Sequence, residues 1–185
     1  MNEGIRRARS DYIIHLHSDD SFYSLDILKK VSLFITKNNN PDWIYGKAKF
    51  INDKGQFRII PHRRIYQKAR FGLLLLTDYI PHQAVFIKRN QFKKNGLFDE
   101  KLKNVMDYEL WLRLTKNKVR SIFIDEIICN FSARFNAQSM NSIGQKEELL
   151  LIEKYVKCSL IAGLLKRVHQ QNQKRNFFIL RPHKD

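Results

Sequence analysis

The sequence predicts an α/β fold, on the basis of three apolar runs and the helical segments that separate them. Runs suited to buried strands lie at residues 12–16, 43–51 and 82–88, with β-branched or aromatic side chains in each. Strands that alternate with amphipathic helices are typical of α/β domains. The chain has 185 residues, 43% of them hydrophobic, so it can bury a sizeable core.

Basic residues strongly outnumber acidic ones. Lys and Arg total 34 against 18 Asp and Glu, which gives a formal net charge of +16. This excess predicts attraction to nucleic acid, an acidic membrane face or a phosphorylated substrate; the alternative is a basic surface that only keeps the protein soluble. Residues 58–70 contain no acid, and their cations are Arg58, Arg63, Arg64, Lys68 and Arg70. No nucleic-acid-binding motif is recognisable, so that interpretation depends on charge alone.

The cysteines and the hydropathy pattern bear on location. Cys129 and Cys158 lie far apart and match no metal-ligand spacing, which fits a reducing compartment. No apolar run reaches the roughly 18 to 20 residues that a membrane-spanning helix needs. The sequence therefore favours a cytoplasmic location.

The chain is expected to begin with a helix at residues 1–10, followed by the strand that starts at Tyr12. That strand ends abruptly in two adjacent carboxylates, Asp19 and Asp20. Ligands of open α/β sheets bind just outside the carboxyl ends of the strands, and two acids there can hold a divalent cation and, through it, a diphosphate. The alternative is that Ser18, Asp19 and Asp20 cap a helix at 25–34. The residues alone leave both hypotheses open.

A hairpin is expected next. Residues 43–51 form its first strand, 52–55 its turn, and 56–60 its returning strand. The basic loop 61–70 follows, and then a short apolar helix or loop at 71–79. Asn52-Asp53-Lys54-Gly55 is a turn signal, and Ile80-Pro81 marks an extended boundary.

The second half of the chain begins with the strand at 82–88. A short helix at 89–94 is expected to end at Gly96. Two short strands, 119–124 and 127–131, precede one long amphipathic helix at 147–168, in which Leu149, Ile152, Val156, Leu160 and Leu164 are in line.

The clearest helix lies within residues 104–118. Leu110, Trp111 and Leu114 form its apolar stripe, so Trp111 is expected in the core and not at a ligand. Asp107 stands at the start of this helix, where it can cap the helix or act as a general base. Local sequence does not decide between these roles.

Four motifs in order carry a resemblance to a known family: MNEGI, DYIIHLHSDD, HQAVFIKR and GLFDEKLKNVMDYELWLRL. The sequence resembles the inverting family 2 glycosyltransferases of the GT-A fold, whose members carry similar motifs at similar spacings. The resemblance runs from Met1 to about Ser139.

The resemblance implies roles for particular residues. Asp19 and Asp20 match the family's DXD-type site, which holds Mg²⁺ or Mn²⁺ and contacts the ribose of a nucleotide-sugar; Asp20 is expected to be the metal ligand and Asp19 to lie nearer the ribose. A divalent cation there stabilises the charge of the leaving diphosphate. Asp107 matches the catalytic base that deprotonates the acceptor hydroxyl. The family's usual preceding acid is replaced by Met106, so only one carboxylate is expected at this place.

Two further positions follow from the resemblance. His82 lies where the family has a strand that lines the acceptor side, although a lone His on a strand often has only a structural role. Arg134 lies in FSARFNAQS, a loop similar to one that closes over the diphosphate. A surface Arg after a strand also needs no special cause.

The resemblance also implies an architecture. It predicts a GT-A-like mixed sheet flanked by helices, without the family's N-terminal strands that cradle the nucleobase. Residues 1–140 would form this partial domain, and residues 141–185 a C-terminal amphipathic helix with a basic tail. The sheet would then have exposed edges.

The implied function is transfer of a sugar, with inversion, from a nucleotide-diphosphate sugar to a saccharide or lipid-linked acceptor, in cell-envelope polysaccharide synthesis. An anionic membrane surface is a further expected partner, since the basic charge and the C-terminal helix favour the inner face of the membrane. Nucleic acid is not expected as a partner of such an enzyme. The alternative is a non-catalytic basic module that binds anionic membrane or nucleic acid.

Overall fold

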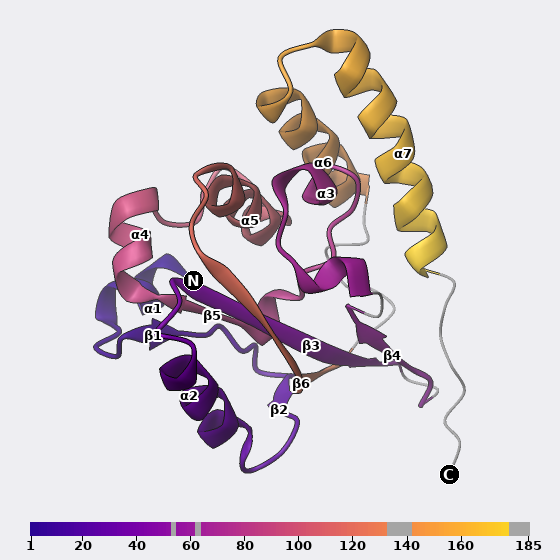
Figure 1. Ribbon diagram of the computed structural model, residues 1–185. Coiled ribbons are helices and arrows are strands. Elements are labelled where there is room, and N and C mark those ends of the chain that lie inside the picture. Colours follow the sequence, from indigo (N-terminus) through magenta and orange to yellow (C-terminus); the bar gives the residue numbers. More distant parts are fainter. Residues whose placement is uncertain (53–54, 62–63, 133–141, 178–185) are drawn as a thin grey trace.

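The computed structural model describes residues 1–52, 55–61, 64–132 and 142–177 (Figure 1). Within these residues a six-stranded mixed sheet has the order β1-β5-β3-β6-β2, with β4 also paired to β3. The central strand β3 is parallel to β6 and antiparallel to β4 and β5. The strands are β1 (Tyr12–Ile13), β2 (Ser21–Phe22), β3 (Trp43–Ile51), β4 (Phe57–Ile60), β5 (Val85–Lys88) and β6 (Ser121–Ser132).

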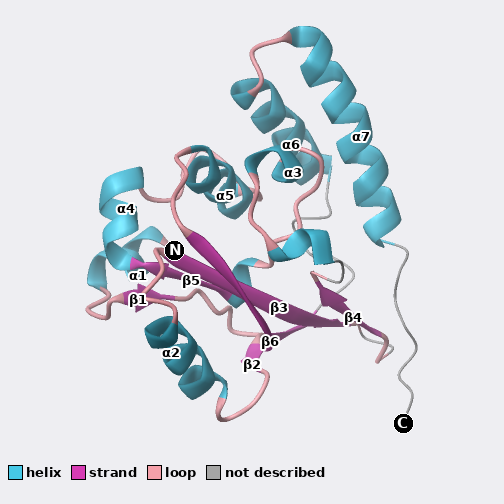
Figure 2. Ribbon diagram, viewed as in Figure 1, coloured by secondary structure: helices cyan, strands magenta, loops and turns pink. Residues whose placement is uncertain are grey.

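Helices cover both faces of this sheet. In Figures 1 and 2, α2 lies below it, whereas α3, α5 and α6 lie above it. The α-helices are α1 (Asn2–Arg7), α2 (Ile27–Lys37), α3 (Phe71–Leu74), α4 (Arg89–Asn95), α5 (Met106–Lys116), α6 (Ser142–Tyr155) and α7 (Ser159–Phe177). Two short 3₁₀ turns, Arg64–Gln67 and His82–Ala84, precede α3 and β5.

The two faces of β3 belong to two separate hydrophobic clusters. Trp43 and Tyr45 pack with the helices above the sheet, while Ile44 and Ala48 pack with α2 below it. Because both faces are covered, β3 reads as a nearly continuous apolar run and not as an alternating one. The indole of Trp43 stacks on that of Trp111, with ring centroids 5.5 Å apart, and this contact fixes α5 on the sheet. The expected core role of Trp111 is confirmed.

Several sequence predictions are confirmed. The hairpin of β3 and β4, the helix α4 ending at Gly96, and the helix MDYELWLRLTK of α5 all lie where they were expected. The mixed sheet flanked by helices is compatible with a glycosyltransferase. The described residues give β1 a pairing partner on one side only, β5.

The strand predicted at 12–16 is much shorter than expected. Only Tyr12 and Ile13 pair in the sheet, and His82–Ala84 likewise form a turn before the strand that begins at Val85. The chain leaves the sheet at this point on both β1 and β5. Polar side chains in His15–Asp20 and His82–Gln83 are therefore free of the ladder and can face one another.

The two strands predicted at 119–124 and 127–131 form one strand, β6. Its register against β3 shifts between Tyr45 and Ala48, which absorbs the polar residues Asp125 and Glu126 without ending the strand. Gly46 makes this irregularity feasible, because a Cβ there would lie 2.6 Å from Cγ1 of Ile128.

The prediction of a single helix at 147–168 is wrong. The chain breaks at 156–158 and returns as an antiparallel hairpin, in which α7 pairs Lys166 with Glu153 and His169 with Glu148. The break lets His169, which is 1% exposed, reach the carbonyl oxygen of Leu75. Tertiary contacts of α7 therefore override the continuous helical pattern.

The predicted domain boundary at residue 140 falls outside the described residues and stays a prediction. On its far side, Leu151 and Ile152 of α6 pack into the cluster above the sheet. Among the described helices, none combines the length and the hydropathy that a membrane crossing requires.

Candidate active site

Two histidines join the acidic turn after β1 to the start of α5. β1 and β5 are antiparallel and Ile13 pairs with Ile87, so the residues after β1 run alongside those before β5. The rings of His17 and His82 meet edge to face, with centroids 4.9 Å apart. Nδ1 of His82 lies 3.3 Å from Oδ2 of Asp107. Segments distant in the sequence thus converge at one end of the sheet.

Asp107 lies in the first turn of α5 but does not cap it. The N-cap is Val105, which makes no side-chain hydrogen bond, and Oδ1 of Asp107 accepts the Tyr108 N–H at 2.9 Å. Burial raises the pKa of Asp107, but the hydrogen bond and charge of His82, with the Tyr108 N–H, outweigh it and hold this pKa below its usual value. The capping alternative is wrong, and Asp107 is an ionised carboxylate oriented by a histidine.

Asp19 and Asp20 form a tight turn and do not cap a helix either. The strand β2 follows them, and α2 begins only at Ile27, with Asp26 as its N-cap. Asp19 is exposed, whereas Asp20 is partly buried and its Oδ2 accepts the His17 N–H at 3.3 Å.

The other carboxylate oxygen of Asp20 has an unusual environment. Oδ1 is buried and has no hydrogen-bond partner within the described part of the chain. Burial is the main cause that raises the pKa of Asp20, the charge of Asp19 adds to it, and the His17 N–H opposes it. A buried oxygen without a partner is costly unless a cation or a donor binds it.

A divalent cation fits this pair of acids. Among the described residues, no group of three or more His, Cys, Asp or Glu side chains could hold a metal by itself. Mg²⁺, however, is usually bound by one or two carboxylates together with substrate phosphates and water. Oδ1 of Asp20 and the exposed carboxylate of Asp19 match that donor set.

A carboxylate that sequence reasoning missed lies beside Asp107. Burial raises the pKa of Asp78 well above its usual value, and the charges of Asp107 and Glu148 raise it further. Asp78 comes from the loop after α3, where no motif marks it. The side chain of Met106, at the position of the missing acid, packs on the core above the sheet. Asp78 brings an acid from another segment near enough to Asp107 to interact with its charge.

The environments of His82 and His15 were not predicted from the sequence. Nε2 of His82 is buried and has no partner among the described residues, so a donor or acceptor from a bound molecule would satisfy it. Burial lowers the pKa of His15 to about 4, and the N-terminal amine adds to this effect. The expected acceptor-side role of His82 stays a prediction. Arg134 lies outside the described residues, and its predicted role stays untested.

Comparison with known proteins supports a glycosyltransferase. The chain is 28% identical to an uncharacterized glycosyltransferase of Rickettsia typhi over 176 residues, which cover 92% of the chain and 52% of that relative. It is 29% identical to one of Rickettsia prowazekii over 154 residues, covering 80% of the chain and 48% of the relative. A "PGL/p-HBAD biosynthesis glycosyltransferase" of Mycobacterium bovis is 28% identical over 119 residues, or 63% of the chain and 43% of the relative.

No protein-family model matches the chain. The chain spans about half of the length of these three relatives. Their shared description, glycosyltransferase, is compatible with the mixed α/β sheet of this chain.

Proposed function

We propose that the protein is an inverting, family 2 type glycosyltransferase that moves a sugar from a nucleotide-diphosphate sugar to a hydroxyl of a saccharide or lipid-linked acceptor. The convergence of the acidic turn and Asp107 at one end of the sheet, joined by His17 and His82, carries this proposal. The glycosyltransferase relatives support it at the level of the class. A role in cell-envelope polysaccharide synthesis is part of the same proposal.

Asp107 acts as the general base in this reaction. The acceptor oxygen attacks the anomeric carbon, its proton passes to Asp107, and the bond from that carbon to the diphosphate oxygen breaks on the opposite face. A single displacement of this kind inverts the anomeric centre. A base works by position first, and His82 fixes the position of the Asp107 carboxylate.

Asp20 and Asp19 stabilise the leaving diphosphate through a bound cation. They would hold Mg²⁺ or Mn²⁺, which supplies positive charge for the departing diphosphate when it is bound. Burial raises the pKa of Asp78 well above its usual value and the charge of Asp107 adds to this effect, so both favour its neutral form. A neutral Asp78 can donate a hydrogen bond in the site without competing with Asp107 as the base.

Attachment to the inner face of an anionic membrane completes the proposal. Leu160, Ile161 and Leu164 are 85%, 54% and 63% exposed and lie at the start of α7. Exposed Lys157 and Arg167 flank them. Aliphatic side chains between cations are typical of helices that lie in a membrane interface. This surface would bring the site close to a lipid-linked acceptor.

A donor hydrolysis and transfer assay with Mn²⁺ tests the enzymatic proposal. Wild-type protein should release nucleoside diphosphate from at least one member of a panel of nucleotide-sugars. Asp20→Asn should reduce this release by about a hundredfold or more, since charge stabilisation of the leaving group is lost. Asp11→Asn, which alters an exposed carboxylate outside the site, is the matched control.

Two results would contradict the proposal. One is equal turnover by wild type and Asp20→Asn. The other is binding of anionic membranes or nucleic acid that survives Asp19→Ala and Asp107→Ala while no donor is turned over, which would favour a non-catalytic basic module.

A further inference from the structure

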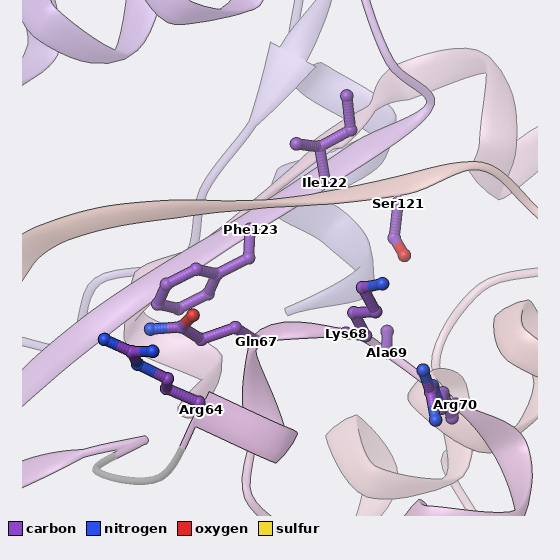
Figure 3. A pocket seen from close by; sticks show the side chains of 8 residues that line it. All are labelled: Arg64, Gln67, Lys68, Ala69, Arg70, Ser121, Ile122 and Phe123. Atoms are coloured by element: carbon purple, nitrogen blue, oxygen red, sulfur yellow. The ribbon is translucent and has the colours of Figure 1, made fainter.

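A groove of about 580 Å³ lies away from the acidic turn, between the basic loop and β6. Its lining residues are Arg64, Gln67, Lys68, Ala69, Arg70, Ser121, Ile122 and Phe123. Figure 3 shows Arg64 and Gln67 on the side of Phe123, and Lys68 and Arg70 on the side of Ser121. A volume of this size suits a small organic ligand.

The groove follows the edge of β6. Successive side chains of a strand point to opposite faces of the sheet, so a groove that touches Ser121, Ile122 and Phe123 in turn must run along the strand's edge. Within the described residues, β6 pairs with β2 only at Cys129 and Asn130, far from this groove. Edge backbone N–H groups next to the groove are therefore available as donors.

The charged residues that line the groove are all basic. Arg64, Lys68 and Arg70 are exposed, and none of the eight lining residues is acidic. Among the described residues, none of these three cations forms an ion pair. Three cations without acidic partners form a region of positive potential that attracts an anion.

The backbone that carries these cations is held by buried tyrosines. The hydroxyl of Tyr79 donates to the Lys68 carbonyl at 2.9 Å and accepts the Arg70 N–H at 3.1 Å. The hydroxyl of Tyr45 donates to the Tyr66 carbonyl at 2.8 Å, and the Tyr66 and Tyr79 rings stack with centroids 4.7 Å apart. The backbone at residues 66–70 is thus held in place before any ligand arrives, which lowers the entropic cost of binding.

The groove and the acidic turn lie toward opposite ends of β6. Asp20 is close enough to Cys129 to raise that thiol's pKa, in second place after burial, whereas the groove begins at Ser121. Eight residues of extended strand span roughly 25 Å. A ligand in the groove therefore does not contact Asp20.

We propose that this groove is a second binding site for a phosphate-bearing ligand, with Arg64, Lys68 and Arg70 as its phosphate contacts and Phe123 as an apolar wall. Arg and Lys make charge-assisted hydrogen bonds to phosphate oxygens, and the Gln67 amide and Ser121 hydroxyl add neutral donors. The phosphate can belong to a soluble ester or to a lipid headgroup, because the same groups recognise both.

Calorimetric titration with inorganic diphosphate, in chelator and without divalent cations, tests the proposal. Wild-type protein should bind one diphosphate per chain. The triple variant Arg64→Gln, Lys68→Gln, Arg70→Gln should bind it at least about tenfold more weakly. The control variant Arg9→Gln, Lys93→Gln, Lys101→Gln removes the same charge from exposed positions elsewhere and should bind as wild type does.

Asp20→Asn should also bind diphosphate as wild type does, so this result is independent of whether the protein transfers sugar. Equal weakening in both triple variants would overturn the proposal, because it would assign the binding to net charge. Absence of diphosphate binding by wild type would overturn it too, even if a single-stranded oligonucleotide bound.

Vesicles of phosphatidylcholine with and without a polyprenyl phosphate separate the two sources of the ligand. In one outcome, wild-type protein is retained on the phosphate-containing vesicles and released from them by diphosphate, while the Arg64, Lys68 and Arg70 variant is not retained. This result supports the groove and assigns it to a lipid phosphate. Binding of diphosphate without such retention supports the groove and assigns it to a soluble ester.

Discussion

At the scale of single residues, the proposed reaction depends on the contact between His82 and Asp107. Asp107 is partly buried, and burial alone would favour its protonated form. The His82 ring, 3.3 Å away, and the Tyr108 N–H reverse this effect. The carboxylate is therefore charged and oriented, which are the two properties that a general base needs.

Asp107→Asn should lower the rate of sugar transfer by about 10²- to 10⁴-fold, because the acceptor proton loses its base. Circular dichroism and the melting temperature should stay close to those of wild type, since Asn can still accept the Tyr108 N–H. A variant that transfers sugar at the wild-type rate would refute the assignment of Asp107.

His82→Ala should move the acidic limb of the pH–rate profile to higher pH. His82 lowers the pKa of Asp107, so without it the carboxylate is protonated at a higher pH and the base is lost earlier on acidification. His82→Asn retains a donor near the position of Nδ1 and should restore part of the difference. Identical profiles for all three proteins would show that His82 does not act through Asp107.

Asp78→Asn should change how stability depends on pH. The folded-state pKa of Asp78 is raised, so the folded protein binds more protons than the unfolded chain and wild-type stability falls as pH rises above about 4. Asn cannot ionise, so the variant should be more stable than wild type at neutral pH, by on the order of 1 kcal/mol, and equal to it in acid. Urea unfolding at several pH values measures this. Parallel curves for the two proteins would contradict it.

At the scale of elements, the irregular pairing of β3 with β6 depends on Gly46. A Cβ at this position would meet Cγ1 of Ile128 at 2.6 Å and the carbonyl oxygen of Glu126 at 3.0 Å. Gly46→Ala should therefore reduce the free energy of unfolding by about 1–3 kcal/mol, as overpacking of a well-packed site does.

Gly163→Ala is the matched control for Gly46→Ala. Gly163 lies within α7 with open space around its Cα, so alanine should be neutral or stabilise the helix by up to about 1 kcal/mol. Chemical denaturation of both variants tests the pair. If Gly46→Ala were as stable as Gly163→Ala, the close approach of β3 and β6 at Ile128 would be wrong.

The hairpin of α6 and α7 holds the loop that carries Asp78. His169 bonds the Leu75 carbonyl and Glu148, and the Asn172 amide donates to the Leu76 carbonyl at 3.1 Å. His169→Ala should lower the unfolding free energy by roughly 1–3 kcal/mol, because a buried side chain loses its packing and its contact with the Leu75 carbonyl. Exposed Gln170→Ala should change stability by less than about 0.5 kcal/mol. Equal unfolding midpoints for the two variants would refute this role of the hairpin.

At the scale of the whole molecule, the proposed membrane attachment combines charge with exposed aliphatic side chains. The chain carries a net charge of +16, and the start of α7 exposes Leu160, Ile161 and Leu164. Charge alone would give membrane binding that salt removes, whereas inserted side chains add apolar burial that salt does not weaken.

Leu160→Ser with Leu164→Ser should lower cosedimentation with vesicles that contain phosphatidylglycerol by about tenfold, since two buried leucines contribute at least 1.4 kcal/mol. Leu33→Ser with Leu28→Ser, exposed positions on α2, is the control. Binding that ignores the anionic lipid content, or that falls equally in both variants, would rule out this membrane surface.

Much of the fold could be predicted from local sequence, because certain elements are specified by short-range patterns. The apolar stripe with Trp111 defined α5, and the 52–55 turn defined the hairpin of β3 and β4. The errors lie where tertiary contacts compete with local preference. The pattern at 147–168 is compatible with one helix. In the structure this segment is divided between two helices, and the contact of His169 with the Leu75 carbonyl accompanies the division.

The sequence by itself determined the α/β class, the core helix α5 and the three carboxylates Asp19, Asp20 and Asp107 as candidates, because residue type and periodicity are local properties. Only the tertiary structure decided that the acidic turn and Asp107 cap no helix and that His17 and His82 connect them. It also decided that Asp78 comes near enough to Asp107 to interact with its charge. These relations depend on the antiparallel pairing of β1 with β5 and on the docking of α7. Contacts between segments so far apart in the chain leave no periodic signal in it, since no local preference of the backbone encodes them.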